Sequence, residues 1–144
     1  MSQTTWSGPL ASGTLNAGIT GGPNIGLALL TQTATLTTNA GLVQNATFNI
    51  PNGAQITNIV VDVLTAYNSA TSATLSVGTS SGDSTYVSGG NVETAGRESI
   101  TFTAAALTAM SNVGANTSVV ATVTSVGVPT AGTVVVTIHY IQKP

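Results

Sequence analysis

The stretch TVVVTIHYI, residues 133–141, alternates two sets of side chains over nine positions. One set is Val134, Val136, Ile138 and Tyr140, and the other is Val135, Thr137, His139 and Ile141. Because successive residues of an extended chain point to opposite faces, the alternation predicts a β-strand. Both faces carry apolar residues, so we expect both to be covered, one of them by a partner molecule.

Similar short patterns, separated by turn residues, fill most of the chain before this strand. The patterns predict strands over residues 31–38, 45–50, 56–67, 72–77, 85–87 and 118–124. Ala46, Phe48 and Ile50 are expected to point inward. Ile59, Val61 and Val63 share one face of their strand, with Val60 and Leu64 on the other, and Ala73, Leu75 and Val77 share a face of theirs. The turn residues Pro129–Gly132 predict an antiparallel hairpin between the last two strands. Seven to nine short strands predict an all-β fold, an antiparallel β-sandwich or jelly roll.

One short helix interrupts the strand patterns. Residues 104–111, AAALTAMS, are good helix formers, and Thr103 stands where an N-cap is expected. Leu107 and Met110 are three residues apart, so we expect them to share the face that packs on the sheets. The helix is expected to close one end of the sandwich.

The chain contains very little charge. Charged residues are 4% of the 144, against about 25% in ordinary globular domains. Two basic residues cannot form the footprint that a phosphate backbone needs, so we expect no nucleic-acid partner. The 42% of hydrophobic residues argue against disorder. A net charge near zero favours self-association, which is typical of a protein that is assembled.

The sequence also bears on export, membrane insertion and disulfides. The N-terminus lacks the pattern of a signal peptide, and no apolar run approaches a membrane span of about 20 residues. With no cysteine, disulfides and thiolate metal sites are impossible. We therefore expect synthesis in a host cytoplasm and release by lysis within a particle, with no membrane partner.

Residues 6–26, WSGPLASGTLNAGITGGPNIG, are uncharged and rich in turn formers. As a whole they follow neither a helical nor a strand period, and such a long irregular stretch in a compact domain is usually functional or disordered. We expect residues 1–28 to be an extended arm on a neighbouring molecule, and residues 29–144 to be the β-sandwich domain. A flexible tail, or a first strand packed on its own domain, is the alternative. The expected contacts are Trp6, Pro9, Leu10, Leu15, Ile19, Pro23 and Ile25.

The few residues that could carry chemistry do not form a recognisable site. His139 is the only histidine, and it is expected to face solvent or an interface. Asp83 reads as a turn residue that bonds its own backbone, and Asp62 as a strand residue that faces water or protects a sheet edge. Glu93 and Arg97 lie in a charged loop that is either solvated or forms a salt bridge between subunits. We expect no catalytic, cofactor or metal site.

Four segments together resemble a family of phage structural proteins. They are Trp6–Thr14, Gly22–Gly26, Ala73–Thr79 and Thr130–Ile141, and the family is the capsid cement, or decoration, proteins of tailed bacteriophages. The resemblance implies a β-sandwich or jelly roll, often a homotrimer, on the outer surface of the capsid. There it would bridge subunits of the major capsid protein and stabilise the head of the virion. The alternative is a head-fibre or tail-associated adhesin domain that binds glycans on the host surface.

Overall fold

The computed structural model describes residues 29–69, 71–115 and 118–142, so the expectation of an arm over residues 1–28 lies outside it. The described residues form strands and one helix, most of them close to the predicted positions. In chain order they are β1 (Leu29–Thr37), β2 (Val43–Asn49), β3 (Gln55–Thr65), β4 (Ser72–Gly78), β5 (Val87–Asn91), β6 (Gly96–Arg97), α1 (Ala104–Ser111), β7 (Ser118–Val126) and β8 (Thr133–Ile141).

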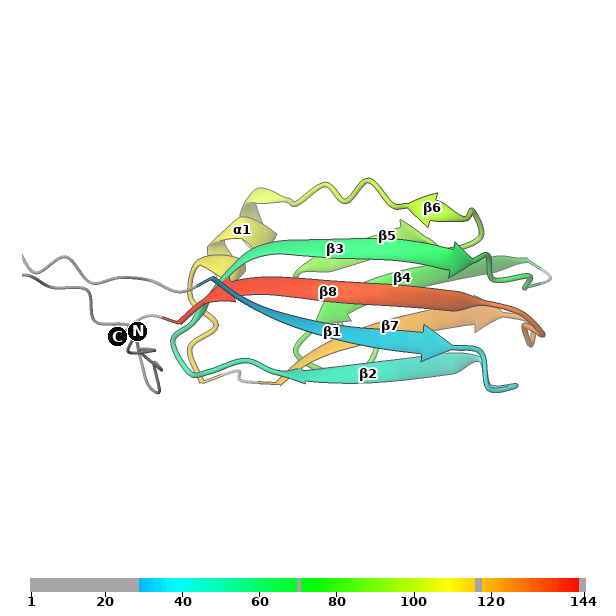
Figure 1. Cartoon of the computed structure of the whole chain (residues 1–144), viewed down its shortest axis with the longest axis horizontal. Helices are drawn as coiled ribbons and strands as arrows, with labels where there is room; N and C mark the ends of the chain where they lie inside the picture. The colour runs from blue at the N-terminus through cyan, green and yellow to red at the C-terminus, as the bar shows by residue number, and fades with distance from the viewer. Residues whose placement is uncertain (1–28, 70, 116–117, 143–144) are drawn as a thin grey trace, which may run out of the picture.

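The strands form two antiparallel sheets of four, which pack face to face (Figure 1). One sheet has the order β1-β8-β3-β6 and the other has the order β2-β7-β4-β5. Apart from β4 and β5, strands that follow one another along the chain belong to opposite sheets. This winding of eight strands is a jelly roll, so the predicted all-β sandwich is confirmed.

The predicted hairpin between the last two strands is wrong. β7 lies between β2 and β4 in one sheet, and β8 lies between β1 and β3 in the other. Each strand already has a hydrogen-bonded partner on both sides, so neither has a free edge for the other. The residues after β7 do reverse the chain, but they carry it across to the opposite sheet. A turn motif specifies the reversal and leaves open which sheet receives the next strand.

The core lies between the two sheets and contains Phe48 and Ile50, which were predicted to point inward, together with one of the alternating sets of each long strand. Val134, Val136 and Ile138 of β8 are completely buried, as are Leu75 and Val77 of β4. β3 contains a bulge, because its pairing with β8 shifts between Ile56 and Asn58. The extra residue turns both Ile56 and Ile59 inward, although they are three positions apart.

The helix begins and ends where the sequence predicts, but its buried face differs. The backbone N–H of Ala106 donates to the hydroxyl of Thr103, which confirms the N-cap. Ala106 and Met110 are buried, whereas Leu107 is 54% exposed, so the predicted pairing of Leu107 with Met110 is wrong. The helix sits at one end of β3 (Figure 1). Its orientation there, which the sequence does not specify, buries the face that carries Ala106 and Met110, which are four residues apart. No helix in the described part of the chain is long and apolar enough to cross a membrane.

The strand predicted at 85–87 is displaced along the chain. The observed strand, β5, runs from Val87 to Asn91 and contains Gly89 and Gly90. Thr85 is held instead by Asp83. A pair of glycines weakens a strand pattern, so the sequence gives little indication of β5.

Candidate interaction surface

The outer face of the sheet β1-β8-β3-β6, here called the threonine face, is a regular surface of the domain. The strand register aligns its side chains in rows. The rows are Thr31, His139 and Asn58, then Thr33, Thr137 and Val60, and then Thr35, Val135, Asp62 and Arg97. The β1 threonines are exposed and the β8 residues are half-buried. The alternation in β1 and β8 thus produces a polar surface without charge over most of its area.

Side chains of neighbouring strands on this face are joined by hydrogen bonds. The hydroxyl oxygens of Thr33 and Thr137 lie 3.2 Å apart, and Thr31 Oγ1 lies 3.2 Å from Nδ1 of His139. Cross-strand pairs of this kind stabilise a sheet by roughly 0.2–1 kcal/mol each. His139 therefore faces outward on a strand, as predicted, and its ring is held by a threonine.

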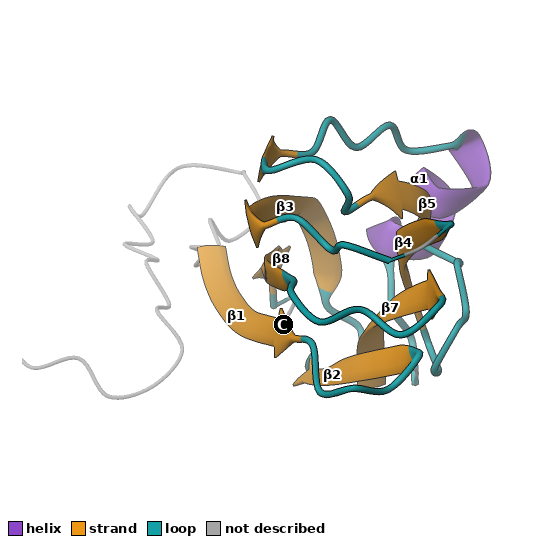
Figure 2. Cartoon of the chain, turned by 90° about the vertical axis from the view of Figure 1, so that its right-hand side faces the viewer, coloured by secondary structure: helices purple, strands orange, loops and turns teal. Residues whose placement is uncertain are grey.

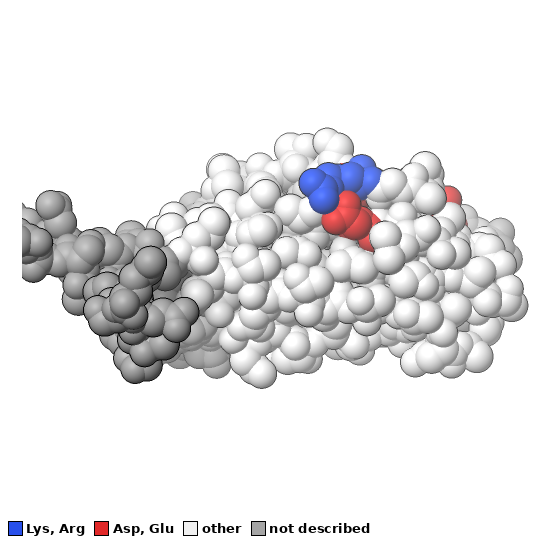
Figure 3. All heavy atoms as spheres, in the orientation of Figure 1, with Lys and Arg blue, Asp and Glu red and all other residues white. Residues whose placement is uncertain are grey.

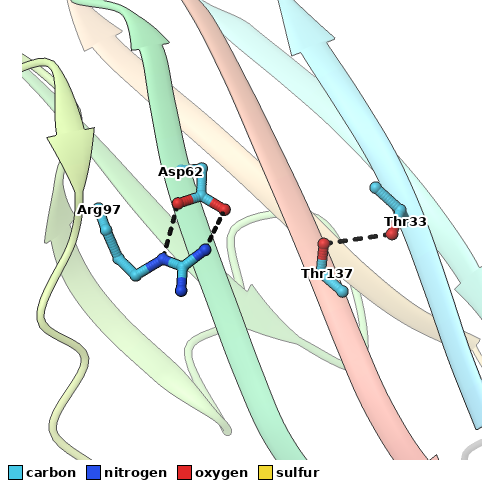
Figure 4. A network of polar contacts seen from close by, with 4 residues as sticks. All are labelled: Thr33, Asp62, Arg97 and Thr137. Carbon is cyan, nitrogen blue, oxygen red and sulfur yellow. Dashed lines mark hydrogen bonds and ion pairs between the residues drawn. The ribbon is translucent and has the colours of Figure 1, made fainter.

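One ion pair is the only charged feature of the threonine face among the described residues. Arg97 on β6 donates from Nε to Asp62 Oδ1 at 2.8 Å and from Nη2 to Asp62 Oδ2 at 3.0 Å. Figure 4 shows the two parallel bonds, and Figure 3 shows the pair as a single spot on a face that is otherwise almost white. Hydrogen bonding to Arg97 lowers the pKa of Asp62 and raises the pKa of the guanidinium. The two charges therefore compensate each other within one chain.

The outer face of the opposite sheet is partly covered by its own chain. The loop after β4 folds over it, and the backbone N–H of Gly82 donates to the hydroxyl of Thr122 on β7. That hydroxyl in turn donates to the side chain of Asn45 on β2. Thr122 is completely buried as a result, although it points away from the core. The threonine face has no equivalent cover in the described residues.

Asp83 holds this loop in place, as its sequence context predicts. Oδ2 accepts from the backbone N–H of Thr79 at 2.7 Å and from the hydroxyls of Thr79 and Thr85 at 2.9 and 2.8 Å. Oδ1 accepts from the backbone N–H of Thr85 at 3.2 Å. These donors, above all the Thr79 N–H, lower the pKa of Asp83 to about 2. A side chain at position 78 would collide with the Asp83 carboxylate, which explains Gly78.

Five exposed apolar side chains lie towards the distal end, the end of the sandwich opposite the start of β1 and the end of β8. They come from the loop after β1, the start of β2, the end of β3, the end of β7 and the loop after β7. The residues are Leu42, Val43, Leu64, Val126 and Val128, each between 46% and 64% exposed.

The predicted contact residues are only partly within the described structure. Trp6, Pro9, Leu10, Leu15, Ile19, Pro23 and Ile25 lie outside it. Arg97 bonds Asp62, and Glu93 accepts from the hydroxyl of Ser69 at 3.0 Å. A salt bridge between subunits through this loop stays a prediction. The Asp62–Arg97 pair was missed because its members are 35 residues apart, and only the pairing of β3 with β6 brings them together.

Two kinds of small-molecule site have little support in the described residues. No group of three His, Asp or Glu side chains there could hold a metal ion. Tyr67, Tyr86 and Tyr140 are buried, so their rings are not available as flat platforms for a sugar.

Comparison with known proteins gives one likeness, and it concerns the fold. No protein-family model matches the sequence, and no curated protein matches it. A solved chain described as "Cyanophage Pam1 capsid asymmetric unit" superposes with a TM-score of 0.59 at 17% identity. The superposition covers 94% of this chain and 99% of that chain. This chain therefore has the fold of a protein found in a cyanophage capsid structure.

Proposed function

We propose that this chain is a structural protein of a bacteriophage virion, a cement protein that binds the outer surface of the capsid and bridges major capsid subunits. The observation that carries the proposal is the likeness to the cyanophage Pam1 chain, which extends over nearly the full length of both. A shared fold is not by itself a shared function. The low charge and the uncovered threonine face supply the further support.

The threonine face has the composition that a protein contact requires. The central part of an interface is depleted of charged residues, because burying an unpaired charge is costly. On this face the only charges of the described residues already neutralise each other at 2.8 Å. The remaining hydroxyls can exchange water for partner hydrogen bonds. A stable interface buries about 1,200–2,000 Å² of surface, summed over both partners. The threonine face and the arm together would supply this chain's part of that area.

The arm is proposed to extend the contact beyond the domain. Trp6 is the expected anchor within it, because tryptophan is enriched among the residues that dominate binding energy. Proline and glycine, as at Pro9 and Pro23, let an extended backbone approach a surface closely. We propose that the assembled unit is a homotrimer without enzymatic activity or a bound cofactor.

The adhesin alternative predicts binding to glycans of the host surface in place of binding to capsids. Jelly rolls occur in lectin domains as well as in viral capsids, so the fold does not separate the two. The burial of Tyr67, Tyr86 and Tyr140 favours the cement role. Glycan-array binding, with no binding to capsids, would support the adhesin.

The test is a binding assay with capsids that lack this chain. The full chain should bind them at a fixed, saturable ratio, measured by co-sedimentation and electron cryomicroscopy. A variant without residues 1–26 should remain folded by circular dichroism and lose the binding. Full binding by the truncated chain would refute the role of the arm, and no binding by the intact chain would refute the cement proposal.

A further inference from the structure

The two long sides of the sandwich differ in how their edge strands are protected. On one side β6 has two residues, and β5 has five, with two glycines and an irregular pairing to β4. Arg97 adds a charge there. Short, irregular and charged edges are the usual means by which proteins prevent strand pairing with other chains.

The opposite side has none of these features. β1 has nine residues and β2 has seven, and they lie next to each other (Figure 2). Neither contains a charge or a proline, and their pairing with β8 and β7 continues without a register shift. Among the described residues β1 pairs with β8 alone. Its other side is therefore free to pair with an added strand.

Over residues 30–34 the core-facing side chains of β1 are also incompletely covered. Leu30 is 36% exposed, and Gln32 and Ala34 are half-buried, whereas their partners on β8, Tyr140, Ile138 and Val136, are buried. β2 is a poorer acceptor, since its Asn49 carbonyl already accepts from Gln32 Nε2 at 2.6 Å. An apolar side chain added beside β1 would cover Leu30 and Ala34.

A segment outside the described residues has the pattern that this edge requires. Although residues 6–26 as a whole follow no strand period, the seven residues TLNAGIT, 14–20, alternate strictly. Leu15, Ala17 and Ile19 fall on one face, and polar or small residues fall on the other. The segment contains neither charge nor proline. Residues 21–28 connect it to β1 and can span at most about 28 Å when extended, so the segment can lie beyond the sheet to which its own β1 belongs.

We propose that residues 14–20 of a neighbouring copy add to the free side of β1 as an extra strand. Leu15, Ala17 and Ile19 cover the partly exposed core side of β1, and the polar face continues the threonine face. The donor is a second copy, because an unprotected edge favours pairing between chains and the few charged residues, 4% of the chain, offer little repulsion between copies. Main-chain hydrogen bonds supply the affinity in such strand addition. The inference deepens the proposed arm function, and Trp6 and Leu10 stay available for the capsid.

The first test changes the donor and leaves the described domain intact. Ala17→Pro removes an N–H from the middle of the segment, and Ser7→Pro, in the same arm but outside the segment, is the matched control. Analytical ultracentrifugation should find an oligomer for the natural chain and for Ser7→Pro. Ala17→Pro should raise the dissociation constant at least about tenfold. A monomeric natural chain, or an oligomer indifferent to Ala17→Pro, overturns the proposal.

The second test asks which copy donates the strand. The chain has no cysteine, so Asn16→Cys can be placed in one copy and Thr33→Cys in another. One of the two copies carries a tag, so that the two differ in size and a crosslinked pair can be identified. After mixing, a thiol crosslinker should join the two copies. Absence of that product, or a link formed only within one chain of the double variant, overturns the exchange. Neither test uses a capsid, so failure here together with intact capsid binding leaves the cement proposal standing.

Discussion

Replacing Asp83 by asparagine should release the loop that covers the second sheet. The substitution keeps the size of the side chain. However, an amide has a single oxygen, so it can accept hydrogen bonds at only one of the two positions where the Asp83 oxygens accept them. With the oxygen at the Thr79 position, the NH₂ group would face the backbone N–H of Thr85, which now bonds Oδ1 at 3.2 Å. Two donors in contact repel each other, and one of the four bonds is lost.

The size of the effect follows from the pKa of Asp83, which falls from 3.8 to about 2 on folding. One pKa unit corresponds to about 1.4 kcal/mol, so the charged form gains at most about 2.5 kcal/mol. Asp83 is partly exposed, and solvent screening reduces the expected contribution to about 1–2 kcal/mol. Because the folded pKa is the lower one, this contribution is complete above about pH 4 and is lost as the pH falls towards 2.

Urea unfolding from pH 7 down to pH 2 measures the difference between the natural chain and Asp83→Asn. The difference should be about 1–2 kcal/mol at neutral pH and should shrink between pH 4 and 2. Glu93→Gln is the control, since Glu93 accepts a single side-chain bond, from Ser69. A difference that is absent at pH 7, or that does not change with pH, would show that the carboxylate does not hold the loop.

Three further experiments test other parts of the structure. Gly132→Ala would place a Cβ 2.5 Å from the ring of Tyr67, so thermal unfolding should show a loss of about 1–3 kcal/mol. A double-mutant cycle on Arg97→Ala and Asp62→Ala should reveal a favourable coupling that weakens at high salt, because both groups are close to solvent. Thr103→Ala removes the N-cap of α1 and should cost about 1 kcal/mol in urea unfolding.

Each of these has a control within the chain. Gly90→Ala meets its neighbours at an ordinary 3.6 Å and should be nearly neutral, so an equal loss at both glycines would count against the contact with Tyr67. Thr103→Ser keeps the capping hydroxyl and should restore most of the stability. A coupling energy between positions 62 and 97 that does not change with salt concentration would contradict an ionic origin.

The features that could be predicted from sequence are local ones. The alternation in β8 and β4 identified which side chains share a face, because side chains two apart in a strand lie on the same side whatever the partner strand is. The cap at Thr103 and the turn role of Asp83 depend on bonds to residues within four positions. Such bonds require no knowledge of the rest of the fold.

The arrangement of the strands could not be obtained in this way. Apolar alternation indicates that a face is buried but does not indicate which strand or sheet covers it. For this reason the sequence of β7, a turn and β8 predicts a hairpin, although the two strands lie in opposite sheets. The same limit applies to Asp62 and Arg97, and to Thr122, which is buried by a loop from elsewhere in the chain. The unprotected edge of β1 is a property of position in a sheet.

Periodicity, caps and turns are therefore already present in the order of the residues, since each depends on atoms that are neighbours along the chain. Strand order, ion-pair partners and open edges arise only when distant segments pack together. In this protein the second group contains the surfaces through which it is proposed to assemble, because both the threonine face and the free side of β1 exist only once β1, β8 and β3 lie side by side.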